Sequence, residues 1–271
     1  MRSAVGCGKR LKKDRMLRRG LLFYLLCNSI PLCFSTGLTV PVSVQSPQSR
    51  CPQTKVGESY LPGFYTMAQF QIVELARRGS VKEVPGWTPE HTAYKIGPHF
   101  NFRINTRSAY PTGLPEEFAF EAVFRMHGDT LNRIWNIWQM QDLNGNEQLA
   151  VSLNGQALSV EFSYITAENG VATALFPHLP FLFNSRWHKM LLVVKRSTVS
   201  LIVDCVLVGT QQLSARGRVS LDGYTYMAKL KDNTAVSVPF ELQLMLIHCD
   251  VTVLQRDTCG NLPASSSVKV L

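Results

Sequence analysis

The sequence predicts an all-β protein, a two-sheet antiparallel β-sandwich of the jelly-roll type with one amino-terminal helix. Three observations predict it. Short runs rich in β-branched and aromatic residues recur after residue 92, turn dipeptides such as Asn144-Gly145 and Asn169-Gly170 separate them, and no helical segments alternate with them. Runs of strands without intervening helices indicate two packed sheets in one domain, and about two hundred residues are enough to bury a sizeable core.

One helix is predicted at residues 64–78. Met67, Ile72 and Leu75 fall at helical spacings, a Pro-Gly pair precedes them, and Gly79 follows directly.

About eleven strands are expected to follow the helix. The clearest pair is a hairpin in which Trp187-His188 opens the first strand, Lys195 to Thr198 forms the turn, and Asp204-Cys205 closes the second strand. The expected strands cover residues 93–96, 100–104, 118–126, 134–141, 147–153, 158–164, 171–176, 187–195, 199–203, 224–230 and 238–247.

Residues 1–35 have the features of a secretory signal peptide. The first twenty residues are strongly basic, Leu21 to Cys33 is largely apolar, and the small Ser35 offers a cleavage point. The alternative is a membrane anchor, if the apolar run extends to Val40. Residues 36–50 are rich in Ser, Pro, Val and Gln and are expected to form a flexible linker.

The basic character of the chain belongs to this leader. Eight of the 28 basic and one of the 19 acidic residues lie in it, so residues 36–271 carry twenty bases against eighteen acids, a net charge of +2. A nucleic-acid-binding domain needs a basic face on the folded part. Nucleic acid is therefore excluded as a partner, and a membrane is a partner only if the leader stays uncleaved.

Four cysteines follow the leader: Cys51, Cys205, Cys249 and Cys259. An even number in an oxidising compartment predicts two disulfides, for which three pairings are possible. A zinc site is disfavoured because no two of the four stand at the Cys-x-x-Cys spacing that clusters ligands on one turn.

The sequence offers no catalytic motif. The six histidines form no His-Glu-x-x-His pattern, and no serine stands in Gly-x-Ser-x-Gly. Asp142 begins a sequence like that of a calcium loop, but the glycine comes too early and a hairpin turn is expected. Trp135 and Trp138 are expected to pack in the core or at its rim, and their spacing of three predicts opposite faces of a strand.

Short motifs carry a family resemblance, and with them the chain resembles thrombospondin amino-terminal-like domains, a laminin-G-like branch, over about residues 51–264. It looks closest to the amino-terminal non-collagenous domain of the collagen alpha-1(IX) chain. The motifs occur in this order: Cys51-Pro52, Leu61-Pro62-Gly63-Phe64, Gln69-Phe70-Gln71, Ala93-Tyr94-Lys95, Tyr110-Pro111, Gly113-Leu114-Pro115-Glu116-Glu117, Trp135-Asn136-Ile137-Trp138-Gln139, Trp187-His188-Lys189, Val203-Asp204-Cys205 and Pro239-Phe240-Glu241-Leu242-Gln243.

The resemblance implies a secreted, non-catalytic module of the extracellular matrix, of the fibril-associated collagen type, without a cofactor. Its expected partners are matrix proteins and, weakly, heparan sulfate. A secreted lectin-like sandwich that binds carbohydrate is the alternative. The resemblance also implies the pairs Cys51–Cys249 and Cys205–Cys259. No Gly-x-y triplets follow Ala264, and residues 265–271 are expected to be a tail, so both a truncated collagen and a stand-alone paralogue stay open.

The resemblance implies two further kinds of site. Glycosaminoglycan contacts are expected at basic residues, here Arg77, Arg78, Lys195, Arg196, Arg216, Arg218 and Arg256. The family zinc site uses two aspartates and a histidine, whose positions here are Ser220, Asp222 and Gly260. A serine hydroxyl and a glycine cannot replace those ligands, so Asp222 is a lone remnant and no metal is expected; a hairpin-turn role is predicted for Asp222-Gly223.

Overall fold

The structure, a computed structural model, describes residues 51–56 and 59–252. The predicted leader 1–35, linker 36–50 and tail 265–271 lie outside the described residues. So do Arg256, Cys259 and Gly260.

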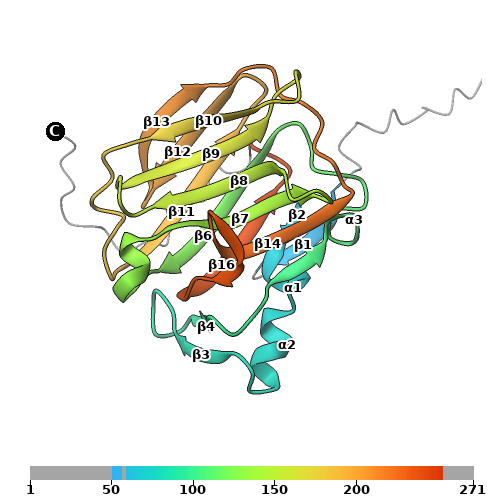
Figure 1. The fold of residues 1–271 in the computed structure, drawn as a ribbon. Helices are drawn as coiled ribbons and strands as arrows, with labels where there is room; N and C mark the ends of the chain where they lie inside the picture. The colour runs from blue at the N-terminus through green and yellow to red at the C-terminus, as the bar shows by residue number, and fades with distance from the viewer. Residues whose placement is uncertain (1–50, 57–58, 253–271) are drawn as a thin grey trace, which may run out of the picture. The chain divides into compact units, whose positions relative to one another are not determined.

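Two antiparallel sheets pack face to face, which confirms the predicted all-β sandwich (Figure 1). The nine-stranded sheet runs β1 (Gln53–Val56), β2 (Ser59–Tyr65), β16 (Phe240–His248), β6 (Phe118–Arg125), β11 (Trp187–Val194), β12 (Thr198–Val203) and β13 (Val206–Gln212), with β4 (Thr92–Ile96) on β16 and β3 (Lys82–Pro85) on β4. The seven-stranded sheet runs β10 (Val171–Phe176), β9 (Ser159–Ile165), β8 (Glu147–Asn154), β7 (Ile134–Asp142), β14 (Gly223–Leu230) and β15 (Asn233–Ser237), with β5 (Arg103–Asn105) on β14.

The core lies between the sheets and follows from alternation along the strands. In β6, Phe118, Phe120 and Phe124 stand at even positions and are almost fully buried. In β9 of the opposite sheet, Val160 and Phe162 do the same. Side chains at alternate positions share one face, so each strand contributes one apolar row to the interior.

Trp135 and Trp138 are both fully buried, 0% exposed, so their predicted placement on opposite faces of β7 is wrong. The register of β7 against β8 shifts between Asn136 and Trp138. A β-bulge at Ile137 therefore adds one residue and returns Trp138 to the core face. There its ring stacks on Phe120 of the other sheet, with 5.8 Å between ring centroids.

The structure divides the predicted helix at residues 64–78 into two short helices, α1 (Thr66–Gln69) and α2 (Ile72–Arg77). Gln71 between them has a φ of +55°, a left-handed conformation that interrupts the helical hydrogen bonds. The other helical segments are α3 (Thr106–Ala109) and the 3-10 turn η2 (Gly128–Asn132). None of the helices within residues 51–252 that the structure describes is long and apolar enough to cross a membrane.

Each expected strand overlaps an observed one, and the structure adds β1, β2, β3, β13 and β15. The hairpin of β11 and β12 forms as predicted, and Asp204 and Cys205 then make a tight turn into β13. Both turn residues have positive φ, 47° and 69°. This is the backbone of a two-residue hairpin turn, which usually has glycine at the second position, so Asp204-Cys205 is not predicted as a turn.

Asp204 is held in this turn by its neighbours on β11. Its carboxylate accepts a hydrogen bond from the backbone N–H of Lys189, at 2.9 Å, and lies 2.7 Å from Nδ1 of the buried His188. Nε2 of His188 lies 3.0 Å from Oδ1 of Asn184. His188 is buried, and through Asp204 it holds the turn that carries Cys205.

Cys51 and Cys249 form a disulfide, which is the first pair implied by the resemblance. It joins the residue before β1 and β2 to the end of β16, across a sequence separation of 198 residues. Cys205 is also disulfide-bonded. Its implied partner, Cys259, lies outside the described residues.

Glu121 of β6 is a buried carboxylate, 5% exposed, on the face of the nine-stranded sheet opposite the core. Nε2 of His248 lies 2.5 Å from its Oε2, and Nζ of Lys189 lies 2.8 Å from its Oε1. Burial alone raises the pKa of Glu121, but the hydrogen bond from His248 and the charge of Lys189 outweigh it and lower the pKa to about 2.

We expect Glu121 to make the fold acid-sensitive. Its folded pKa lies below its ordinary value of 4.5, so its contribution is present above about pH 4.5 and is lost as pH falls toward about 2. A shift of this size corresponds to roughly 3 kcal/mol. Urea unfolding at about pH 5 and about pH 2.5 should show a smaller acid-induced loss for Glu121→Gln than for the wild type.

The control for this experiment is Glu74→Gln on α2. Glu74 is an exposed carboxylate that pairs with Arg78 at 2.9 Å, and exposed ion pairs contribute little. Its variant should lose as much stability in acid as the wild type does. An equal acid-induced loss in Glu121→Gln and the wild type would contradict the assignment.

The second prediction concerns the disulfides. Non-reducing peptide mapping of the secreted chain should give Cys51–Cys249 and Cys205–Cys259, and a Cys205–Cys249 peptide would contradict this pairing. Replacing Cys51 and Cys249 together by serine should cost about 2–5 kcal/mol of unfolding free energy, because the bond closes a long loop in the unfolded chain.

Candidate functional site

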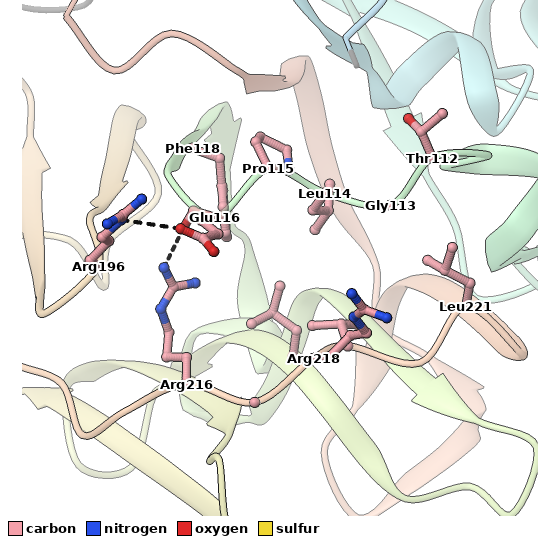
Figure 2. Close-up of a pocket in the computed structure, with 13 residues that line it drawn as sticks. Thr112, Gly113, Leu114, Pro115, Glu116, Phe118, Arg196, Arg216, Arg218 and Leu221 are labelled. Carbon is pink, nitrogen blue, oxygen red and sulfur yellow. Dashed lines mark hydrogen bonds and ion pairs between the residues drawn. The ribbon is translucent and has the colours of Figure 1, made fainter. Parts of the chain in front are cut away.

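A pocket of about 920 Å³ is lined by residues from both sheets. One wall is the segment 112–116 with Phe118, which leads into β6; the other is Arg216 to Val219 with Leu221, from the connection between β13 and β14. Arg196, in the turn between β11 and β12, and Leu149 of β8 complete the lining. We call this the rim pocket (Figure 2).

The connection from β13 to β14 crosses from one sheet to the other, and its position is fixed at Gly217. The backbone N–H of Gly217 donates to the carbonyl of Ile165 at 2.8 Å. A Cβ at this position would lie 2.4 Å from the carbonyl oxygen of Thr166, which is closer than any side chain allows. Glycine therefore permits the close approach that sets Arg216 and Arg218 on either side of it.

Arg216 is the central side chain of the rim pocket. Its guanidinium donates to the backbone carbonyls of Glu116 and of Lys195, the latter at 3.2 Å. Its Nε is buried and has no hydrogen-bond partner among the described residues. Burial lowers the pKa of Arg216, while the nearby carboxylates of Glu116 and Glu117 oppose that effect.

Two carboxylates accompany the arginines. Nε of Arg196 lies 3.1 Å from Oε2 of Glu116, and both side chains are largely exposed. The backbone N–H of Arg196 donates to Oε1 of Glu117 at 3.1 Å. Such exposed ion pairs are worth at most about 1 kcal/mol and weaken with salt. A competing anion can therefore displace Glu116 at little cost.

The arrangement is suited to binding an anionic group. Arginine guanidinium groups present several N–H donors in a planar fork that fits carboxylate, sulfate or phosphate. Arg218 is exposed at the same pocket and points toward the side opposite Arg196 (Figure 2). Across residues 51–252, apart from the two omitted positions, no group of three or more His, Cys, Asp and Glu side chains is placed to hold a metal ion.

The structure brings together only part of the basic residues that the sequence suggests. Arg196, Arg216 and Arg218 line the rim pocket, and Lys195 contacts it through its carbonyl. The other candidates are elsewhere: Arg77 and Arg78 belong to the end of α2, where both pair with Glu74 at 3.8 and 2.9 Å, and Arg256 lies outside the described residues.

Sequence reasoning missed the acidic side of the pocket. Glu116 and Glu117 belong to a motif block that the resemblance highlights, but they lie about a hundred residues before Arg216. Only the folded sheets bring that block against the arginines.

Asp222 lies in the crossing connection, so its predicted hairpin-turn role is wrong: β13 and β14 belong to different sheets. Its carboxylate pairs with Arg107 of α3 at 2.6 Å. Position 223 requires glycine, because β14 approaches β7 so closely there that a Cβ would lie 1.9 Å from the carbonyl oxygen of Gln141. Ser220 donates through its hydroxyl to the carbonyl of Asp222.

The hairpin between β7 and β8 forms as predicted around Asp142. Its carboxylate accepts from the backbone N–H groups of Asn144 and Asn146, and from Nδ2 of Asn146, each at 2.9 Å. These hydrogen bonds lower the pKa of Asp142.

The chain is similar in sequence to several collagen chains. The chain is 30% identical to the collagen alpha-1(XXI) chain of Xenopus laevis over 187 residues, which are 68% of this chain and 19% of that one. It is 34% identical to the collagen alpha-1(XVI) chain of Homo sapiens over 160 residues, 59% of this chain and 10% of that one. It is 29% identical to the collagen alpha-1(XX) chain of Homo sapiens over 242 residues, which are 86% of this chain and 18% of that one.

The chain therefore spans at most about a fifth of the length of these relatives. No family model matches it. The homologues are collagen chains, which are secreted structural components of the extracellular matrix. The homology supports an extracellular collagen-type module and agrees with the predicted absence of catalysis.

Solved structures that are similar in fold include mouse laminin alpha1 chain domains LG4-5, with a TM-score of 0.40 and 11% identity over 51% of this chain and 37% of that one. The binding domain of Paraclostridial Mosquitocidal Protein 1 matches with a TM-score of 0.45 and 10% identity, over 74% of this chain and 48% of that one. At these scores the likenesses say nothing about function.

The third prediction concerns metal at Asp222. Isothermal titration of the metal-stripped chain with zinc should show no binding at micromolar metal, because Asp222 is paired with Arg107 and a single carboxylate is too few ligands. Stoichiometric zinc binding that disappears in Asp222→Ala would contradict it.

Proposed function

We propose that the chain is a non-catalytic extracellular-matrix module of the fibril-associated collagen type, and that its rim pocket binds anionic groups of matrix proteins or, weakly, of a sulfated glycosaminoglycan. The observation that carries the proposal is that Arg196, Arg216 and Arg218 line one pocket, with Nε of Arg216 buried and without a partner among the described residues. The homology to collagen chains supports the matrix setting. The finer resemblance, to the type IX collagen domain, is part of this proposal.

The charges around the pocket explain why the binding is weak. Glu116 and Glu117 stand beside the arginines, so the pocket is not uniformly basic. Residues 36–271 carry a net charge of only +2, and long-range attraction of a polyanion is correspondingly small. The expected ligand group is one sulfate or carboxylate held locally by guanidinium groups, rather than a long polyanion held along a basic face.

Heparin chromatography of the secreted chain tests the proposal. Retention should be weak and salt-sensitive, with elution below about half-molar salt. Arg218→Gln should elute earlier, because it removes one exposed guanidinium from the pocket without disturbing the bonds of Arg216. Glu116→Gln should elute later, because it removes the carboxylate that competes for Arg196.

The matched control is Arg77→Gln, which removes an exposed arginine from α2. It should leave retention unchanged if binding is local to the rim pocket. Elution above about half-molar salt, or an equal effect of Arg77→Gln and Arg218→Gln, would contradict the proposal.

A further inference from the structure

Exposed apolar side chains gather on two edge strands. Of the six large hydrophobic residues that are exposed in the described part of the chain, four lie on β10 and β13: Val171 (55%), Leu175 (46%), Val206 (42%) and Leu207 (60%). Each strand is the last one of its sheet, and the two edges lie beside each other, where Nε2 of Gln211 donates to the carbonyl of Leu175 at 3.0 Å. Apolar exposure concentrated in one place indicates an interaction surface.

Strand β10 lacks the features that normally protect an edge. Its sequence from Val171 to Phe176 has no charged residue and no proline. Among the described residues it pairs only with β9, so no strand forms a backbone ladder with its other side, where the side chain of Gln211 on β13 donates to the carbonyl of Leu175. Natural edge strands are usually interrupted by charges, prolines or bulges, because an open edge is a template for another strand.

The outward groups of this edge can be assigned. The carbonyl of Leu175 accepts from Gln211 and therefore points away from β9. Backbone polar groups alternate between the two sides of an antiparallel strand, so those of Thr173 and Val171 point outward as well. The side chains of these same three residues lie on the face of the sheet opposite the core, beside one another.

We propose that this edge binds a second copy of the chain, through antiparallel pairing of β10 with β10 about a two-fold axis at Thr173. In this register Val171 faces Leu175 of the second copy, Thr173 faces Thr173, and Leu175 faces Val171. The three outward-pointing residues form the hydrogen-bonded pairs of the new ladder, and the two seven-stranded sheets become continuous.

The strand is complementary to itself in this register. The apolar Val171 and Leu175 cover each other, and a threonine pair is favourable at the centre. Exposed Glu168 lies in the turn before β10 and exposed His178 follows the strand, so the two-fold axis brings the end that carries the carboxylate in one copy to the end that carries the histidine in the other. A partner of unrelated sequence would match these positions only by chance.

Pairing costs one existing contact. The side-chain amide of Gln211 must release the carbonyl of Leu175, which then accepts from the backbone of the second copy. One hydrogen bond is exchanged for another of the same kind, so the net cost is small.

Sedimentation velocity of the full secreted chain over a wide concentration range tests the proposal. The wild type should show a reversible monomer–dimer equilibrium. Thr173→Lys and Thr173→Glu should each weaken dimerisation about tenfold or more, because like charges then meet across the axis. An equimolar mixture of the two variants should restore dimers, because opposite charges then meet.

The matched control is Thr210→Lys on β13. Like Thr173, Thr210 is an exposed threonine near an edge whose hydroxyl bonds a serine on the next strand: Ser200 at 2.8 Å, as Ser163 lies 3.1 Å from Thr173. This variant should dimerise as the wild type does. Thermal unfolding of all variants checks that each is folded.

Other results would overturn the proposal. A wild type that stays monomeric at every concentration excludes it. Loss of dimers in Thr210→Lys with no effect of Thr173→Lys moves the interface to β13. Dimers that survive both charge variants, or a mixture of the two that stays monomeric, exclude the two-fold register at Thr173.

Discussion

The contact between the two sheets at Trp138 and Phe120 is the interaction on which the rest of the structure depends. Trp138 reaches Phe120 because a bulge at Ile137 turns it inward, and its indole N–H lies 3.3 Å from the hydroxyl of the buried Tyr110. The opposite strand, β14, accommodates the bulge at Ala228, whose φ is +58°. Burial of the two tryptophans fixes the distance between the two sheets. The positions of the loops and edge strands at the surface depend on that distance.

The rim pocket is one consequence of this spacing. The chain must cross from the nine-stranded to the seven-stranded sheet between β13 and β14, and it does so against the end of β9, where Gly217 allows close approach. The crossing carries Arg216 and Arg218 to the segment that contains Glu116. The lining of the pocket therefore combines three arginines with Glu116, an arrangement consistent with the weak, salt-dependent binding that we propose.

The open edges are another consequence. Curved sandwiches that do not close into barrels leave terminal strands, and here the two on one side, β10 and β13, carry no charges. The other side is different in composition, since β3 contains Lys82, Glu83 and Pro85. Four of the six exposed large hydrophobic residues in the described part of the chain lie on the side of β10 and β13.

The sequence by itself determined the fold class, each of the expected strands, the hairpin turns at Asn144-Gly145 and Asn169-Gly170, and the number of cysteines available for pairing. These features depend on alternation, turn residues and composition, which are local. The tertiary structure decided the bulge that buries Trp138, the split at Gln71, the turn at Asp204-Cys205 and the grouping of Arg216 with Glu116. The bulge, the turn at Asp204-Cys205 and the arginine–glutamate grouping depend on contacts between different strands or segments, where burial and hydrogen bonding override the local preference of the residue.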